Sequence, residues 1–372
     1  MEPSVRDRLR TRSTHQRGRR PVTSTGRRRP RQADIAKLAG VSQTTVSLVI
    51  NDRESETVRI PPETRQRVLE VARSLGYVAD PVARSLAGGT NRLIGVYTFE
   101  SMFPMDHHDF YHPFLVGIEA RAEALGYDMV LFTSATGADG GRSVYRDGVN
   151  RLRLADGCVL LGKETDRDDI VRLRDEGFRF VLVGRRDIPG DGVAFVGADY
   201  AKATEEVVDH LVALGHTTIA YLPARTPSEP SDDRDAGFTA ARTRHGLRTD
   251  GLVVPVDRDA GPARSDVEGL LTAGATAFLA HESVVALRIH AILTELGLDV
   301  PRRCSVAALN DPPDGVPGPE LTCFRIPRRE MGALAVDLLI RQIESDEADA
   351  ETVTLPCTFV AGETSGPKDR SQ

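Results

Sequence analysis

Residues 32–51 decide how the first part of the chain folds, and they read Gln32-Ala-Asp-Ile-Ala-Lys-Leu-Ala-Gly-Val-Ser-Gln-Thr-Thr-Val-Ser-Leu-Val-Ile-Asn51. Apolar residues recur at helical spacing on both sides of Gly40, which predicts one helix over 33–39 and another over 43–50. Gly40 has the backbone freedom that a three-residue turn requires, and Ser42 is a suitable N-cap for the second helix. The stretch therefore predicts two short helices joined by a tight turn, with Ile35 and Leu38 facing Val46 and Val49.

The second of these helices has a polar face near its N-terminus. With Ser42 as the N-cap, Gln43, Thr44 and Ser47 fall on the exposed side. In a helix-turn-helix, that end of the second helix reaches base edges in the major groove. The alternative is a helical hairpin used only for packing, and the spacing alone leaves both interpretations open.

Helical patterns continue on the C-terminal side of this stretch, whereas the N-terminal side has no folding pattern. A third helix is expected over 63–75 and a fourth, short one over 81–87. Residues 1–31 contain eleven arginines and almost no apolar residue, so we expect a disordered basic arm. An organelle transit peptide is the alternative, but the segment has almost no apolar face.

After Asn91 the pattern changes to short apolar strands that alternate with amphipathic helices. Runs without internal alternation, separated by helices, indicate parallel strands covered on both faces. Ten strands are more than a single sheet usually contains, so an α/β domain of two doubly wound lobes is expected. The strands are predicted at 93–99, 128–133, 157–161, 180–184, 193–196, 218–222, 276–280, 305–309, 323–326 and 353–360.

Charge is divided unevenly along the 372 residues, whose net charge is −6. Residues 1–92 hold 19 Lys and Arg against 9 Asp and Glu, and the remaining residues hold 29 against 45. A basic leading segment on an acidic body is typical of a chain whose one end meets a polyanion.

The four cysteines form no C-x-x-C pair, and no apolar run is long enough to span a bilayer. These features favour a cytoplasmic protein with reduced thiols and no membrane association.

The stretch from Asp34 to Ser47 closely resembles the LacI/GalR family of bacterial regulators. The resemblance continues in register through Val49-Ile-Asn51, Thr64-Arg65, Leu75-Gly-Tyr77, Val82-Ala-Arg-Ser-Leu-Ala-Gly88 and Leu93-Ile-Gly-Val96. It implies a helix-turn-helix headpiece over 32–78, a hinge helix and linker over 79–91, and a two-lobed periplasmic-binding-protein-like domain over 92–366. It disfavours the hairpin that only packs.

The resemblance assigns DNA-contacting roles by position. Gln43 and Thr44 correspond to base readers, and Leu48 stands where many relatives have arginine, so operator preferences do not transfer at that position. In the hinge helix, Leu86 would be the minor-groove wedge, although it could instead pack under the headpiece. The full set of expected DNA contacts is Ser42, Gln43, Thr44, Thr45, Ser47, Leu48, Asn51, Val82, Ala83, Arg84 and Leu86.

The family's core crosses between its lobes three times, and we place these crossings near Arg186, Asp311 and Ser345. Lobe one would then comprise about 92–186 and 312–344, and lobe two about 187–311 and 345–366. Carried over by position, Arg234, Glu282 and Asp311 would contact an effector in the cleft. The alternative for each of the three is a surface ion pair or a helix cap.

The segment 99–112 is long for a connection between a strand and a helix and is rich in aromatic and acidic residues. Rings stack on sugar faces and carboxylates accept from hydroxyls, so Phe103, Asp106 and Tyr111 favour a carbohydrate-like effector. His107, His108 and His112 lack regular ligand spacing, so neither a metal nor another cofactor is expected.

The sequence thus predicts an effector-controlled regulator that binds a pseudo-palindromic double-stranded DNA operator as a homodimer. We expect a repressor of carbohydrate uptake or catabolic genes whose effector is a sugar or sugar derivative. A solute-binding protein of the same two-lobed fold is the first alternative, but it should have a secretory signal and no headpiece. An enzyme on this scaffold is the second, and the motifs of dinucleotide, phosphate, serine-hydrolase and zinc-protease sites are absent from the sequence.

Overall fold

The computed structural model divides the chain into two compact units, residues 1–89 and 90–372, which we describe separately. It describes residues 30–50, 60–77, 91–99, 110–133, 142–162, 166–190, 192–313, 315–345 and 350–368. The expected basic arm, except Pro30 and Arg31, lies outside these ranges, as does the expected hinge helix.

The described residues of the first unit form three helices, α1 (Gln32–Ala39), α2 (Gln43–Ile50) and α3 (Pro62–Leu75). Gly40 ends α1 in the left-handed conformation, with φ of 66°, which turns the chain into α2. The Arg67 Nε donates to Ala39 O at 3.0 Å and so joins α3 to the end of α1. The buried apolar side chains of the unit are Ile35, Ala36, Ala39, Val46, Val49, Ile60, Val68 and Ala72.

One of the four side chains expected in this core is not there, because Leu38 is 62% exposed. The buried residues Ile35, Ala36 and Ala39 share one arc of α1. At about 100° per residue, Leu38 falls well to the far side of Ile35 and outside that arc. The prediction for Leu38 was therefore wrong, whereas Ile35, Val46 and Val49 are buried as expected.

The first sheet of the second unit has six parallel strands in the order β12-β7-β6-β5-β1-β2. Their bounds are Leu93–Thr98 for β1, Asp128–Phe132 for β2, Gly157–Leu161 for β5, Phe180–Val183 for β6, Ala194–Ala198 for β7 and Thr352–Leu355 for β12. The helices of this lobe are α5 (His112–Ala124), α6 (Arg167–Asp175) and α11 (Arg328–Glu344). The short elements β3 (Tyr145–Arg146), β4 (Val149–Asn150) and η1 (Arg151–Leu154) precede β5.

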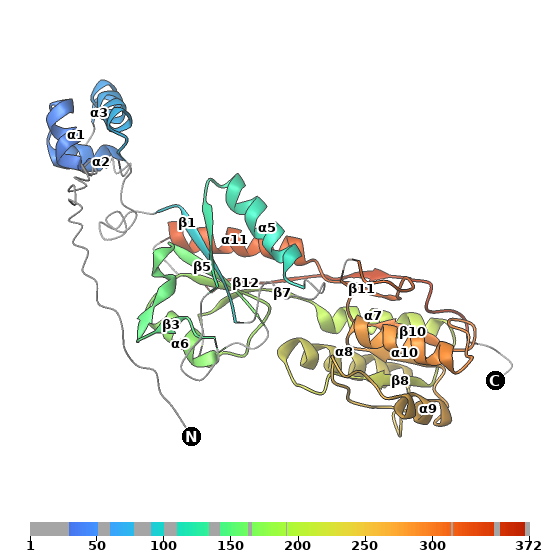
Figure 1. Cartoon of the computed structure of the whole chain (residues 1–372). Helices are drawn as coiled ribbons and strands as arrows, with labels where there is room; N and C mark the ends of the chain where they lie inside the picture. The colour runs from blue at the N-terminus through green and yellow to red at the C-terminus, as the bar shows by residue number, and fades with distance from the viewer. Residues whose placement is uncertain are drawn as a thin grey trace, which may run out of the picture. The chain divides into compact units, whose positions relative to one another are not determined.

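The second lobe has a parallel three-stranded sheet, β10-β9-β8, and an antiparallel pair, β11 and β13. Figure 1 shows its helices α8, α9 and α10 gathered around the smaller sheet. The strands are β8 (Ile219–Leu222), β9 (Ala277–Ala280), β10 (Ser305–Ala308), β11 (Cys323–Arg325) and β13 (Thr358–Val360). The helices are α7 (Tyr200–Ala213), α8 (Glu229–His245), α9 (Arg264–Thr272) and α10 (Ser283–Glu295).

The crossings between the lobes differ from the expected ones, because β7 and β12 both belong to the six-stranded sheet. The chain leaves that sheet after Ala198, returns to the first lobe between β11 and α11, and leaves again between β12 and β13. The expected crossings near Arg186, Asp311 and Ser345 all come too early. Arg186 and Ser345 begin polar segments that resemble linkers, but each segment leads to another strand of the same sheet.

Candidate DNA-reading helix and effector cavity

The N-terminus of α2 presents polar side chains to solvent. The Ser42 Oγ accepts from the Thr45 backbone N at 3.0 Å and lies 2.8 Å from the Thr45 Oγ1, which confirms Ser42 as the N-cap. Gln43 and Thr44 are exposed, and their side chains are therefore not part of the hydrophobic interior. Of the other expected contacts on this helix, Thr45, Ser47 and Leu48 are half-buried, and Leu48 packs against the core of the first unit.

The remaining expected DNA contacts lie outside the described residues. They are Asn51, Val82, Ala83, Arg84 and Leu86, and the same holds for Phe103 and Asp106 among the expected effector contacts.

A cavity of about 530 Å³, counted up to its open mouth, lies between the two lobes of the second unit. We call it the inter-lobe cavity. It is bounded by the carboxyl ends of β5 and β6, the first turns of α5 and α8, and the start of α10, which is where open α/β sheets bind ligands. Its lining residues are Phe110, Tyr111, Phe114, Leu161, Gly162, Val183, Gly184, Arg186, Tyr200, Pro230, Arg234, Glu282, Asn310 and Met331.

The aromatic wall of the cavity comes mainly from the start of α5. Phe110 meets Tyr111 edge-on with ring centroids 5.4 Å apart, and it lies 5.7 Å from Phe114. Tyr200, at the start of α7, adds a fourth ring. Burial raises the pKa of Tyr200 against the lowering effect of the Arg234 cation, so the phenol stays protonated. The wall can therefore stack a flat ring or the apolar face of a sugar.

Arg234 is the buried cation of the cavity. Its Nε donates to Leu309 O at 2.9 Å, and its Nη1 donates to Pro230 O at 3.1 Å. The guanidinium carbon lies 4.4 Å from the centre of the Tyr200 ring. These contacts fix the plane of the guanidinium at the cavity wall. Arg234 lines the cavity, the position that the sequence analysis expected.

Glu282 also lines the cavity, and Asn310 orients it. The Asn310 Nδ2 donates to the Glu282 Oε2 at 2.9 Å, while the Asn310 Oδ1 accepts from the Ser283 backbone N at 2.6 Å. Glu282 is the N-cap residue of α10, which places its carboxylate at the carboxyl end of β9. A polar groove on the second lobe adjoins the cavity and shares Glu282 with it.

Asp311 lies close to the other expected residues but does not line the cavity. Its carboxylate accepts from the Arg328 Nη1 at 2.8 Å and from the Ile326 backbone N at 3.3 Å. The ion pair joins the end of β10 to the start of α11. An ion pair therefore describes its contacts better than direct contact with an effector, but the pair is not the expected surface one, because the Arg328 and Asp311 side chains are only 11% and 19% exposed.

Several lining residues were not predicted, including Phe114, Arg186, Tyr200 and Met331. Arg186 follows the end of β6 and donates to the carbonyl oxygens of Arg185 and Gly162. Tyr200 follows the end of β7. Both could have been found by examining the first residues after each predicted strand, because parallel strands bring their carboxyl ends to one edge of the sheet.

Under the second-lobe side of the site, Tyr221, Asp235 and His281 form a polar chain in which Tyr221 and His281 are buried and the Asp235 side chain is half-exposed. The Ala224 backbone N donates to the His281 Nδ1 at 3.2 Å, so the His281 Nε2 carries the proton and donates to the Tyr221 hydroxyl. That hydroxyl donates to the Asp235 Oδ1 at 2.6 Å. Burial lowers the pKa of His281, and the three groups satisfy one another as a support for the ends of β8 and β9.

Two family models match the two units. The description "Bacterial regulatory proteins, lacI family" matches residues 33–80, and "Periplasmic binding protein-like domain" matches residues 208–365. No helix among the described residues is long and apolar enough to cross a membrane.

Curated relatives cover nearly the whole chain. The Maltose regulon regulatory protein MalI of Escherichia coli (strain K12) is 27% identical over 342 residues, which are 88% of this chain and 96% of the relative. The Catabolite control protein A of Staphylococcus xylosus is 24% identical over 325 residues, 87% and 95% of the two chains. Both relatives are named as regulatory or control proteins.

A solved structure of the lac repressor dimer bound to operator and the anti-inducer ONPF aligns with a TM-score of 0.68 and 25% identity, covering 91% of this chain and 99% of that one. A helix-turn-helix unit joined to a two-lobed ligand-binding fold defines the class of DNA-binding regulators with a sensory domain. Within that class, residues 33–80 match the lacI family of bacterial regulatory proteins, and the curated relatives that align with most of the chain are regulators.

Proposed function

We propose that this protein is a ligand-responsive repressor that binds a pseudo-palindromic operator as a homodimer and controls genes of carbohydrate uptake or catabolism. The observation that carries the proposal is the pairing of a capped helix with an exposed Gln43 and Thr44 and a separate inter-lobe cavity lined by rings, a guanidinium and a carboxylate. MalI, named for the maltose regulon, supports the carbohydrate link.

In this proposal the first unit supplies the DNA contacts. Gln43 and Thr44 read base edges, because an amide can pair with adenine through two hydrogen bonds and a hydroxyl tolerates several bases. Ser42, Thr45 and Ser47 lie near phosphates, and Leu48 offers only apolar contact. Asn51 and the hinge residues Val82, Ala83, Arg84 and Leu86 complete the interface, with Leu86 as the wedge in the minor groove.

The second unit binds the effector, a sugar or sugar derivative. Tyr111 stacks on the ligand, Arg234 donates to neighbouring oxygens and Glu282 accepts from hydroxyls, while Phe103 and Asp106 add contacts from the preceding segment. Asp311 acts as a positioning residue through Arg328. The protein works in the cytoplasm, has no catalytic role and requires no metal or other cofactor.

A gel shift of the full chain on the promoter of its own operon, with and without a panel of sugars, tests the function. We expect retardation that Gln43→Ala weakens and that at least one sugar changes. The sugar response should be lost in Arg234→Ala while the retardation without sugar persists. Retardation that survives deletion of residues 1–90 would contradict the proposal.

A further inference from the structure

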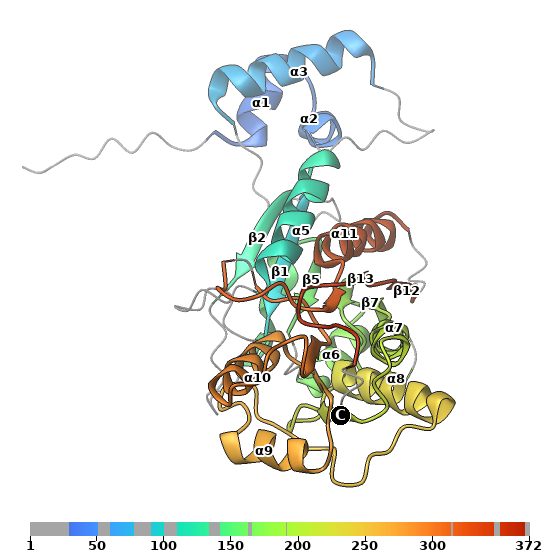
Figure 2. The ribbon, with the colours of Figure 1, turned by 90° about the vertical axis from the view of Figure 1, so that its right-hand side faces the viewer.

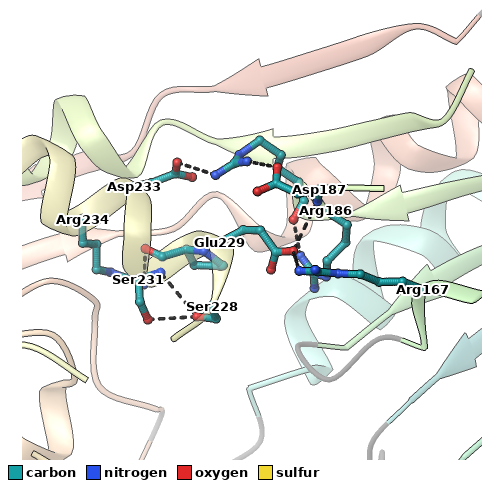
Figure 3. A network of polar contacts seen from close by, with 10 residues as sticks. Arg167, Arg186, Asp187, Ser228, Glu229, Ser231, Asp233 and Arg234 are labelled. Atoms are coloured by element: carbon teal, nitrogen blue, oxygen red, sulfur yellow. Dashed lines mark hydrogen bonds and ion pairs between the residues drawn. The ribbon is translucent and has the colours of Figure 1, made fainter. Parts of the chain in front are cut away.

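The first two turns of α8 are joined to the first lobe by charged groups. The Arg167 Nη2, from the start of α6, donates to the Glu229 Oε1 at 2.9 Å, and the Asp187 backbone N donates to the same oxygen at 3.2 Å. The Arg185 Nη2, after the end of β6, donates to the Asp233 Oδ1 at 2.8 Å. Figure 3 shows the Glu229 carboxylate directed away from its own helix toward Arg167 and Asp187.

Glu229 is only 5% exposed, although it is a carboxylate on the first turn of a helix. A buried charge is costly unless it is paired, and the named partners Arg167 and the Asp187 amide both come from the other lobe. Burial opposes ionisation, but these donors, the Glu229 amide and the nearby Arg186 outweigh it, and the pKa of Glu229 is lowered. The burial of this side chain therefore depends on the two lobes being together.

The same two turns of α8 carry two residues of the cavity wall, Pro230 and Arg234. Glu229 and Pro230 are neighbours in sequence, as are Asp233 and Arg234. A rotation of the second lobe that opened the cavity would therefore also pull Glu229 and Asp233 away from Arg167 and Arg185. The same movement of the second lobe therefore opens the cavity and breaks these ion pairs.

We propose that Arg167–Glu229 and Arg185–Asp233 form an inter-lobe clasp that favours the closed lobes and retains the effector. The effector role rests on the proposed function, whereas the closing role does not. Half-exposed ion pairs are weak singly and are screened by salt, so the clasp makes lobe closure depend on ionic strength.

The amide of Asp187 reports on the clasp, because it donates to Glu229 across the lobes. We would measure its hydrogen exchange by mass spectrometry in the full chain without effector, in wild type and Arg185→Gln. That substitution leaves the Asp187–Glu229 bond and the Arg167–Glu229 pair in place, but it also removes the bond from Arg185 to the Asp187 carboxylate. Asp233→Asn, which breaks only the inter-lobe pair, is therefore measured beside it and must give the same rise. If the pairs act together, exchange of the Asp187 amide should rise about two- to fivefold, the range that one such pair supports.

Arg244→Gln is the matched control, since it also replaces an ion-paired arginine by glutamine and so removes one positive charge. Arg244 lies on α8. Arg244 donates to Glu205 at 2.6 Å and to Asp209 at 2.8 Å, but these acids lie on α7 of the same lobe. It should leave exchange at Asp187 unchanged. Arg185→Lys, which keeps the charge, should lie near wild type, and raising KCl from about 50 to 500 mM should affect wild type more than Arg185→Gln.

Exchange at Asp187 that is equal in wild type and Arg185→Gln, or that rises equally in Arg244→Gln, overturns the clasp. Far-UV circular dichroism checks that Arg185→Gln is folded, and Asp233→Asn breaks the same pair from the other side if it is not. With a sugar that alters the gel shift, Arg185→Gln should also speed sugar dissociation by a similar factor. A failed gel shift with increased exchange at Asp187 would reject the proposed function and leave the closing role intact.

Discussion

Arg234 carries its charge inside the second unit, where it is 6% exposed and, among the described residues, forms no ion pair. Two carbonyl oxygens and the face of Tyr200 stabilise the guanidinium. Carbonyls satisfy its hydrogen bonds without neutralising its charge, so a ligand oxygen at the cavity wall gains a strong donor. The sequence identified the residue, but only its contacts explain why the guanidinium is held in one orientation before a ligand binds.

Arg234→Lys should lower the affinity for a sugar that alters the gel shift by about tenfold or more, because hydrogen bonds to charged groups contribute about 1.5–3 kcal/mol. Lysine keeps the charge but loses the planar fork. Isothermal titration would measure the loss, and DNA binding without sugar serves as the control. Unchanged affinity in Arg234→Lys would show that charge alone suffices.

Ser42 and Gln43 are neighbours with separable roles. Ser42→Ala removes the bond to the Thr45 amide and should destabilise the first unit by about 1 kcal/mol. Gln43→Ala should change operator preference with little effect on stability, because the side chain is exposed. Thermal unfolding followed by circular dichroism, together with gel shifts on operator variants, would distinguish them. Equal loss of stability in both variants would contradict the assignment.

At the scale of elements, α5 and α11 pack closely on one face of the six-stranded sheet (Figure 2). Glycines allow the approach, since a Cβ on Gly332 would lie 2.3 Å from Phe114 O and one on Gly117 would lie 2.0 Å from Arg329 O. Phe114 and Met331 of these helices line the inter-lobe cavity. The spacing of the two helices therefore sets the shape of its aromatic wall.

Gly332→Ala should separate α5 from α11 and destabilise the second unit by about 1–3 kcal/mol or more, as overpacking does. Gly269→Ala is the control. Gly269 lies on α9, and an added Cβ there meets nothing within 4 Å, so helix propensity should stabilise the unit by up to about 1 kcal/mol. Urea unfolding of both variants measures the difference, and equal stabilities would show that the close approach is not required.

Local patterns were sufficient to predict the individual elements. Apolar runs and helical spacing placed all ten strand segments within a few residues, although the last one is split into β12 and β13 around Pro356-Cys357. The errors concerned which strands pair with one another, which is a non-local property of the chain. The pairing of β7 with β6 and of β12 with β7 assigns both strands to the first sheet, and no local feature of 187–193 or 345–351 indicates which sheet the following strand will join.

The candidate site shows the same limit. Tyr111, Arg234 and Glu282 line the inter-lobe cavity. The composition of 99–112 indicated Tyr111, and the resemblance indicated the positions of Arg234 and Glu282. Asp311 does not, since its partner Arg328 comes from the next helix and could not be foreseen from the strand-end pattern. Leu38 was misplaced by assuming an i, i+3 pair where the buried arc of α1 runs through Ala36 and Ala39.

At the scale of the whole molecule, burial lowers the pKa of three histidines among the described residues of the second unit, namely His210, His216 and His281. His216 is the most enclosed by hydrogen bonds. Its Nδ1 meets the Thr276 Oγ1 at 2.9 Å, and its Nε2 meets the Ser305 Oγ at 2.9 Å and Gly366 O at 3.0 Å. The neutral ring thereby ties the starts of β9 and β10 to the C-terminal segment.

These lowered pKa values make the second unit sensitive to acid. In the unfolded chain a histidine takes up a proton near pH 6.5, whereas the folded protein holds these rings neutral until a lower pH. Stability should therefore be constant above about pH 7.5 and should fall between about pH 6.5 and the folded pKa values, by at most about 1.4 kcal/mol per pH unit for each histidine. Urea unfolding of the full chain at several pH values, followed by tyrosine fluorescence, measures the slope.

His216→Asn should be less stable than wild type at pH 8 and should lose less stability on acidification, because one titrating group is gone. A slope that is identical in wild type and His216→Asn would mean that other groups, such as the carboxylates paired with arginine, control the acid response.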